Sequence, residues 1–129
     1  MKKALLSLIL AVSFAQANDA TIVSMHDMEA GLDNIQKGFL YNQPDMILSG
    51  AERISKANKM FLNVGVAQKY LPEHKKHMVG VTLRTANRVD TAIEDLKYYI
   101  QLKEYSNASK SYSAVINACT DCHAIVRGW

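Results

Sequence analysis

The sequence contains no segment in which apolar and polar residues alternate with a period of two, so we expect almost no β-strand. It also contains no low-complexity stretch and no internal repeat, and its 129 residues suffice for one domain with one core. Beyond residue 17 no stretch is apolar enough to span a bilayer, so a soluble mature chain is expected.

Cysteine is scarce. Cys119 and Cys122 are the only two, and they lie three positions apart. A disulfide between them would close a very short loop, and the stabilisation that a disulfide gives grows with loop length. A purely structural bridge therefore explains the pair poorly.

Neither sign of charge dominates. The chain has 15 basic and 12 acidic side chains, and removing Lys2 and Lys3 leaves 13 basic against 12 acidic. This near balance argues against a general nucleic-acid binder, although a local docking patch stays open.

The start of the chain is typical of a secretory signal peptide. Lys2 and Lys3 precede an apolar run from Ala4 to Phe14, and small residues follow at Ala15 and Ala17. We expect cleavage after Ala17, so that residues 1–17 form the signal peptide and residues 18–129 form the mature domain. A retained membrane anchor is the alternative. Export implies a periplasmic protein.

Four segments show helical periodicity, with apolar residues recurring at steps of three and four. The first seam comprises Met25, Met28, Leu32, Ile35 and Phe39; the second comprises Ile47, Gly50, Ile54, Ala57 and Phe61; the third comprises Met78, Thr82, Thr85, Val89, Ala92, Leu96 and Tyr99; the fourth comprises Ala108, Tyr112, Val115, Cys119, Cys122 and Val126. Short connections favour an all-α fold, an up-down-up-down four-helix bundle whose C-terminal helix carries the cysteines. An irregular array of three or four helices is the alternative.

The expected helix boundaries follow from turn and cap residues. Residues 42–45, with Pro44, are expected to end the first helix and begin the second. Residues 63–65 weaken the second helix, and Pro72 fits the opening of the third. Ser106 or Asn107 is expected to cap the fourth.

Residues 119–123 read Cys-Thr-Asp-Cys-His, the c-type haem attachment motif. Two thiols must reach two vinyl groups on one edge of a porphyrin, and the imidazole of His123 must reach the iron. On a helix, Cys119 and Cys122 share one face and His123 lies one turn beyond Cys119. At average residue usage the pattern arises by chance in fewer than about one chain in a thousand of this size.

Two other uses of the motif are less favoured. A dithiol redox motif of the thioredoxin kind needs a strand-helix context, which is absent from the pattern. A zinc site using Cys119, Cys122, His123 and another histidine would more usually show a second ligand pair. The predicted signal peptide supports the haem interpretation of the motif, because c-type haem is attached outside the cytoplasm.

Four expected helices with a haem motif near the C-terminus resemble the class II c-type cytochromes, the cytochrome c-prime family. The resemblance covers the whole mature chain, and its most specific part is the motif followed by Arg127, four residues after His123. It implies one covalent haem c and a cofactor-binding role for Arg127. Thr21 stands four residues before Met25, where many relatives carry an arginine that meets a haem propionate.

The sixth iron position is expected to lie on the first helix. In an up-down-up-down arrangement the first and last helices are antiparallel neighbours, and Met25 and His123 lie at similar distances from the two ends of the mature chain. The resemblance agrees, since its low-spin members use a methionine of the first helix as axial ligand. Met25 is the expected iron ligand opposite His123, with Met28 as the alternative. Core filling is the competing interpretation of both methionines.

These residues predict a non-enzymatic electron carrier in the periplasm, whose partners are periplasmic or membrane-bound redox proteins. If neither methionine reaches the iron, the resemblance implies a five-coordinate protein that binds nitric oxide or carbon monoxide. A peroxidase would need a positioned acid-base pair that the sequence does not provide. A homodimer is neither demanded nor excluded.

Overall fold

The structure is a computed structural model that describes the backbone of residues 2–128 and the side chains of residues 20–128. It consists of α1 (Lys2–Leu40), α2 (Pro44–Asn58), the 3₁₀ helix η1 (Lys59–Leu62), α3 (Val64–Tyr70), the 3₁₀ helix η2 (Glu73–Met78), α4 (Val79–Gln101) and α5 (Tyr105–Arg127). The described part contains no strand, which confirms the expected all-α class. The predicted signal peptide and its cleavage after Ala17 lie outside the described side chains, as does Trp129.

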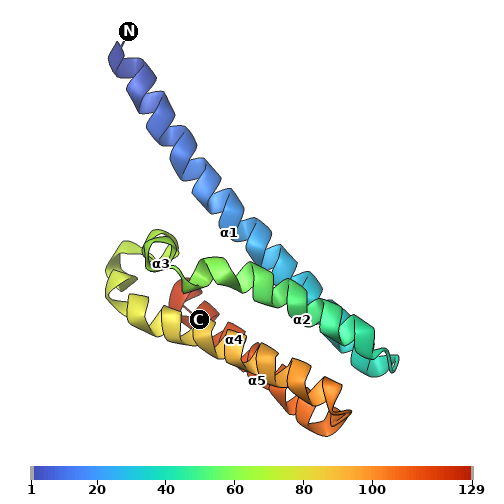
Figure 1. Cartoon of the computed structure of the whole chain (residues 1–129). Helices are drawn as coiled ribbons and strands as arrows, with labels where there is room; N and C mark the ends of the chain where they lie inside the picture. The colour runs from blue at the N-terminus through green and yellow to red at the C-terminus, as the bar shows by residue number, and fades with distance from the viewer. Residues whose placement is uncertain (1, 129) are drawn as a thin grey trace.

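The four long helices form two antiparallel pairs (Figure 1). The helix α1 packs along α2, α4 packs along α5, and contacts between α2 and α4 join the pairs. The short segments η1, α3 and η2 connect α2 to α4 at one end of the molecule (Figure 1). Because α1 and α5 run in opposite directions, the C-terminal turns of α5 lie at the same end as the beginning of the described part of α1.

The turn between α1 and α2 forms as expected. Asn42 adopts a positive φ of 55°, and Pro44 is the first residue of α2, where its missing N–H costs nothing. At the other end, α5 stops at Gly128, whose φ of 77° and whose N–H bond to the Ala124 carbonyl form a left-handed C-cap. The Gly128 cap therefore fixes how far α5 extends past His123.

Two expected boundaries were wrong. Pro72 opens η2, and α4 begins only at Val79, because the residues between them form a 3₁₀ helix instead of an α-helical turn. The last helix begins at Tyr105, ahead of both expected caps, and the Asn107 side chain donates to Glu104 Oε2 at 2.7 Å.

The predicted weak point after α2 holds a separate helix, α3. The Asn63 side chain accepts a hydrogen bond from the Val66 N–H at 3.2 Å, which caps the first turn of α3. Ala67 and Leu71 are buried and pin this segment against the rest of the fold. The chain therefore reaches α4 through an ordered cover instead of a loop.

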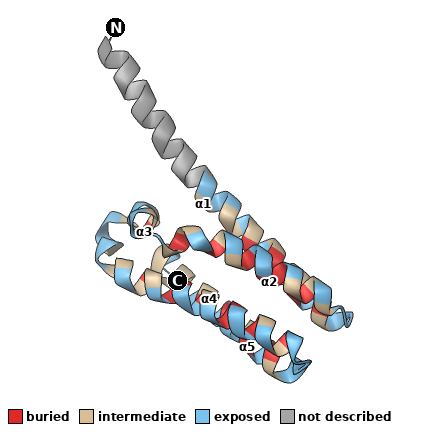
Figure 2. Cartoon of the chain, in the orientation of Figure 1, coloured by how far each residue is buried: buried red, intermediate tan, exposed pale blue. Residues whose placement is uncertain are grey.

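The predicted seams supply the core (Figure 2). Their buried apolar members include Ile35, Ile47, Ile54, Val89, Leu96, Ala108 and Val115. The helices α1 and α2 approach most closely where Gly31 faces Gly50, since a Cβ added to Gly50 would lie 2.5 Å from the Gly31 carbonyl oxygen. Small residues at this crossing allow the two backbones to touch.

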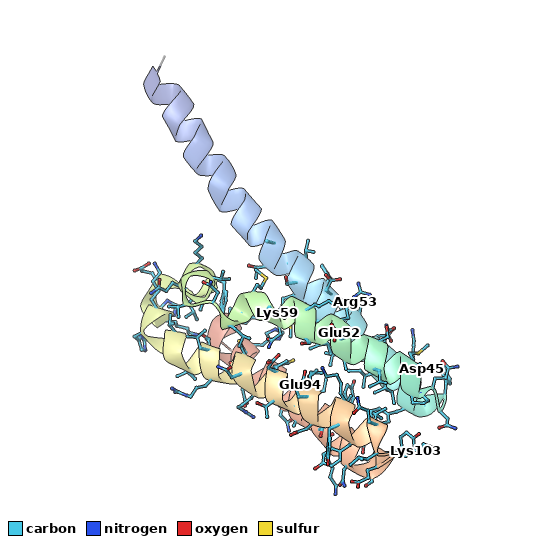
Figure 3. All side chains as sticks on the ribbon, viewed as in Figure 1. Asp45, Glu52, Arg53, Lys59, Glu94 and Lys103 are labelled. Carbon is cyan, nitrogen blue, oxygen red and sulfur yellow. The ribbon has the colours of Figure 1, made fainter. Side chains whose placement is uncertain are left out.

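Charged side chains such as Glu52, Lys59 and Glu94 cover the outer faces (Figure 3). Arg53 on α2 pairs with Asp27 on α1 at 2.6 Å, across the first helix pair. Among the described residues, no helix combines the length and the apolar character that a bilayer crossing needs.

Candidate functional site

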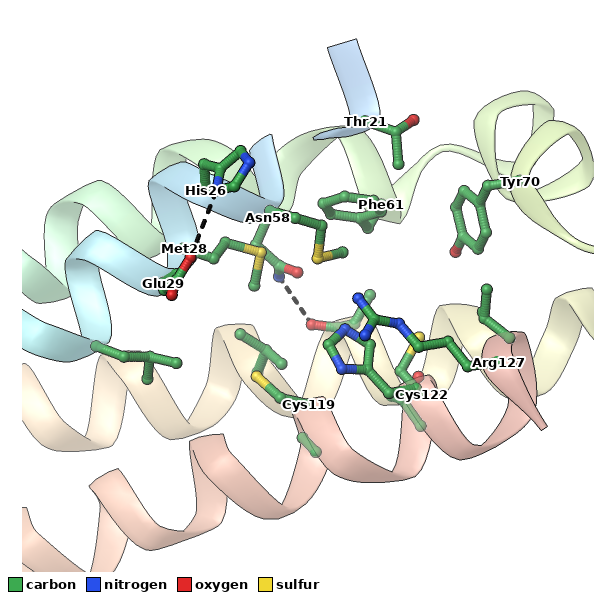
Figure 4. Close-up of a pocket in the computed structure, with 18 of the residues that line it drawn as sticks. Thr21, His26, Met28, Glu29, Asn58, Phe61, Tyr70, Cys119, Cys122 and Arg127 are labelled. Carbon is green, nitrogen blue, oxygen red and sulfur yellow. Dashed lines mark hydrogen bonds and ion pairs between the residues drawn. The ribbon is translucent and has the colours of Figure 1, made fainter. Parts of the chain in front are cut away.

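A cavity of about 590 Å³ opens between α1 and α5 at the end of the molecule that α3 covers (Figure 4). Its volume falls within the range of roughly 300–1,000 Å³ that is usual for small-molecule and cofactor sites. Every site residue predicted from the sequence lines it: Met25, Met28, Cys119, Cys122, His123 and Arg127. The fold thus brings together residues that lie about a hundred positions apart in the chain.

The α5 wall carries the motif. Cys119 and Cys122 lie one helical turn apart and both face the cavity, with Arg127 one turn farther along (Figure 4). Asp121, between the cysteines, points the other way and pairs with Arg88 of α4 at 2.6 Å. The helix therefore turns its two sulfur atoms inward and its intervening carboxylate outward.

The α1 wall carries the two methionines, which are buried to different extents. Met28 is only 7% exposed and belongs to the core, whereas Met25 is half-buried and packs against the edge of the core. Both line the cavity. Met28 is therefore largely committed to packing, and the Met25 thioether is the more accessible of the two.

The register of α1 against α5 brings both methionines near the level of His123. Tyr112 on α5 donates to the Leu32 carbonyl at 3.5 Å and its ring centroid lies 6.1 Å from that of Phe39, so its contacts on α1 span residues 32 to 39. His123 lies eleven residues beyond Tyr112, and the same advance along antiparallel α1 carries that span to residues 21 to 28. Met25 and Met28 both fall within it, so burial is what distinguishes the two.

The remaining lining is mostly apolar and comes from α2, η1 and α4. The Asn58 side chain, 1% exposed, donates to the Ala86 carbonyl at 2.9 Å and ties α2 to α4 beside the cavity. Phe61, Thr85 and Val89 complete this side. Of these, Asn58 was not singled out from the sequence, although it lies four residues after Ile54 on the apolar seam of α2.

Tyr70, at the end of α3, is a lining residue that the sequence did not indicate. Its ring contacts the Phe61 ring edge-on at 5.7 Å, and its hydroxyl oxygen is buried without a hydrogen-bond partner. Burial raises the pKa of Tyr70, and the nearby Thr82 hydroxyl offsets part of that rise. The Thr82 hydroxyl donates its own proton to the Val79 carbonyl at 2.8 Å, and no described group lies within hydrogen-bond distance of the Tyr70 hydroxyl in a geometry that accepts its proton.

Both cysteines are free thiols, and both are half-buried. Burial raises the pKa of Cys119 to about 11, with a smaller contribution from Cys122. Burial also raises the pKa of Cys122, partly offset by the Thr85 hydroxyl. A catalytic dithiol needs a lowered thiol pKa. The surroundings here act in the opposite direction.

His123 is placed for metal binding through a neutral ring. Burial lowers its pKa, and the Arg127 guanidinium lowers it further. The neutral imidazole is the form that ligates metals. Among the described residues, no three His, Cys, Asp or Glu side chains group closely enough to hold a metal ion on their own. His26 lies at the rim of the cavity, where its side chain is 74% exposed and its Nδ1 lies 3.4 Å from Glu29 Oε2.

Comparisons with protein-family models, with curated proteins and with solved structures found no match.

Proposed function

We propose that the protein is a monohaem c-type cytochrome that transfers electrons, with the haem covalently attached to Cys119 and Cys122 and its iron ligated by His123 and Met25. The observation that carries the proposal is the cavity in which the two thiols and the imidazole of α5 face the two thioethers of α1. Haem supplies the one-electron chemistry of its iron when it is bound.

The cavity residues fit this group. A planar macrocycle with an apolar body would need mostly apolar walls, a pair of thiols one helical turn apart, and side chains able to ligate its iron. The lining contains residues of each kind. The failure of Cys119, Cys122 and His123 to converge on one point supports a spread macrocycle over a zinc ion, whose ligands must all lie within about 2.0–2.3 Å of the metal.

The thiols suit the attachment chemistry. Each S–H adds across one vinyl C=C, so the sulfur bonds to one carbon, the hydrogen goes to the other, and no oxidant or reductant is consumed. This requires free thiols held apart from a disulfide, and both cysteines are free. The outward Asp121–Arg88 pair keeps the intervening carboxylate away from the apolar walls.

The role of Met25 is inferred from burial. Both methionines of α1 line the cavity that His123 lines from α5, but Met28 is a core residue whereas the Met25 side chain is half-buried at the cavity wall. A thioether and an imidazole on opposite sides would leave no open iron position, which suits an electron carrier and raises the reduction potential. Arg127 would meet the haem from the mouth of the cavity.

The wider proposal combines the observed helix pairs with the resemblance to the class II c-type cytochromes. The two helix pairs and the haem would together form an up-down-up-down four-helix bundle of the class II c-type cytochrome kind. Residues 1–17 would direct export, and the partners would be periplasmic or membrane-bound redox proteins. An iron that neither methionine reaches would instead bind nitric oxide or carbon monoxide, which is the alternative function.

Expression together with a c-type haem maturation system tests the proposal. We expect covalent haem that survives denaturation, a low-spin absorption spectrum with a weak far-red sulfur-to-iron band, and no change on adding carbon monoxide. The control is the double variant Cys119→Ser, Cys122→Ser, which should lose covalent haem. A wild-type chain without covalent haem would overturn the proposal, and a high-spin spectrum that shifts with carbon monoxide would favour gas binding.

A further inference from the structure

The Tyr70 hydroxyl is a buried polar group whose hydrogen bond is not made within the described part of the chain. Leaving such a group unsatisfied costs about 1–3 kcal/mol, so buried hydroxyls are nearly always paired. This one lies in the wall of the cavity. A ligand bound in the cavity is therefore expected to carry a hydrogen-bond acceptor for the Tyr70 hydroxyl.

We propose that Tyr70 donates its hydroxyl hydrogen bond to a propionate carboxylate of the bound haem and so positions that edge of the cofactor. This inference rests on the proposed function. The rim of a haem carries methyl groups, the two thioether-linked carbons and the two propionates, and only the propionates accept hydrogen bonds. A donor in the wall of a haem cavity therefore has a carboxylate as its natural partner, unless it acts at the iron.

The surroundings of Tyr70 suit a carboxylate. Figure 4 shows its hydroxyl directed into the space beside the Arg127 side chain, which reaches the same region from α5. A neutral donor and a guanidinium together satisfy a carboxylate better than either alone. Thr21, on the α1 side of the cavity, brings a hydroxyl and no charge.

The position of Tyr70 is fixed before anything binds. Ala67 and Leu71, on either side of it in the chain, are 0% and 3% exposed. The next segment, η2, is attached to the last turn of α5 because Lys75 Nζ donates to the Ile125 carbonyl at 2.6 Å. Little ordering entropy therefore remains to be lost when the hydroxyl finds its acceptor.

The expected effect of Tyr70 is on the protonation of the propionate. A hydrogen bond to the charged form lowers the pKa of a carboxyl group, so removing the donor raises it. Hydrogen bonds to charged groups are worth about 1.5–3 kcal/mol, which corresponds to roughly one to two pH units. An ionised propionate favours the ferric state, so its titration appears in the pH dependence of the midpoint potential.

Other groups facing the cavity also titrate or carry charge. Those in its wall are His26, Glu29, Tyr70, Cys119, Cys122, His123 and Arg127. The cysteines would be thioethers and His123 an iron ligand in the loaded protein, which leaves His26 and Glu29 as the wall residues whose contribution has to be separated from that of a propionate. The test therefore includes His26→Gln and Glu29→Gln.

The test compares haem-loaded wild type, Tyr70→Phe, His26→Gln, Glu29→Gln and, as a matched control, Tyr112→Phe. Tyr112 is also a half-buried tyrosine, but it does not line this cavity. The midpoint potential is measured across the pH range in which carboxyl and imidazole groups titrate, and the propionate bending vibration is recorded by resonance Raman spectroscopy.

We expect Tyr70→Phe to move the inflection of the potential upward by about one pH unit or more and to shift the propionate vibration, with neither change in Tyr112→Phe. Coincident curves and vibrations for Tyr70→Phe and wild type would overturn the inference. Loss of the inflection in His26→Gln or in Glu29→Gln, or a change in the iron absorption bands of Tyr70→Phe, would also overturn it. A wild-type chain without haem would overturn the proposed function first, so the two failures are distinguishable.

Discussion

Replacing each methionine of α1 by alanine should separate iron ligation from core packing. Met25 and Met28 lie three residues apart on one helix and both reach the cavity. Only Met28 is a core residue, with 7% of its surface exposed. We therefore expect Met25→Ala to change the haem spectrum and Met28→Ala to change mainly the stability.

The magnitudes follow from burial. Truncating a buried methionine to alanine costs about 2–5 kcal/mol, which we expect for Met28→Ala. In a domain of this size that lowers the melting temperature by roughly 8–20 °C. The packing loss in Met25→Ala should stay below about 2 kcal/mol, because the side chain is only half-buried. Loss of the iron bond in the loaded protein adds to that figure.

The assay combines absorption spectra with imidazole titration and thermal unfolding of the haem-loaded variants. Met25→Ala should become high-spin, lose the sulfur-to-iron band and recover a low-spin spectrum when imidazole fills the vacant position. Met28→Ala should keep the wild-type spectrum and ignore imidazole. The reverse pattern would show that Met28 and not Met25 ligates the iron, and two unaltered spectra would remove methionine ligation altogether.

Three further predictions concern the frame around the cavity. Gly50→Ala should destabilise the fold by about 1–3 kcal/mol, because the new methyl group would lie 2.5 Å from the Gly31 carbonyl oxygen. The matched variant Gly80→Ala, whose new methyl group would have its nearest contact at 3.8 Å, should instead stabilise the fold by up to about 1 kcal/mol. Chemical denaturation measures both free energies of unfolding. Lys75→Met should cost about 1 kcal/mol and speed amide hydrogen exchange in the last turn of α5, since its amine caps a carbonyl there. In the folded chain without attached haem, alkylation of Cys119 should follow a titration centred near pH 11, because burial disfavours the thiolate.

Each of these has a matched comparison. Equal effects of the two glycine substitutions would contradict the close α1–α2 crossing. Unchanged exchange in the last turn of α5, with normal exchange elsewhere, would contradict the lysine cap. Alkylation with a midpoint near 9 in the folded chain, as expected for the same chain in denaturant, would contradict burial of the thiol.

The long helices were predictable because apolar side chains recur on one face of each. Ile35, Ile54 and Leu96 are predicted seam residues, and each is fully buried. The spacing of Cys119 and Cys122 is enough to place both thiols on one face of α5, since side chains that share a helix face recur at steps of three or four. Local pattern therefore suffices for the α5 wall.

The cover of the cavity was not predictable in the same way. The helix α3 has only seven residues, and tertiary burial of Ala67 and Leu71 holds it in place. Its one local signal is the Asn63 cap, and a single cap residue does not fix a helix. The role of Tyr70 depends on the folded position of that helix, so no spacing rule points to it.

The Gly31–Gly50 crossing divides α1 into two stretches that differ in how well they can accommodate a larger side chain. From residue 31 to residue 38 the helix is clamped to α2, where added methyl groups would collide with its neighbour. Position 25 lies nearly two turns before that clamp, at the cavity wall. Under the proposed function, a substitution at position 25 would therefore change the iron ligand, and with it the choice between electron transfer and gas binding, while the clamp keeps the scaffold unchanged.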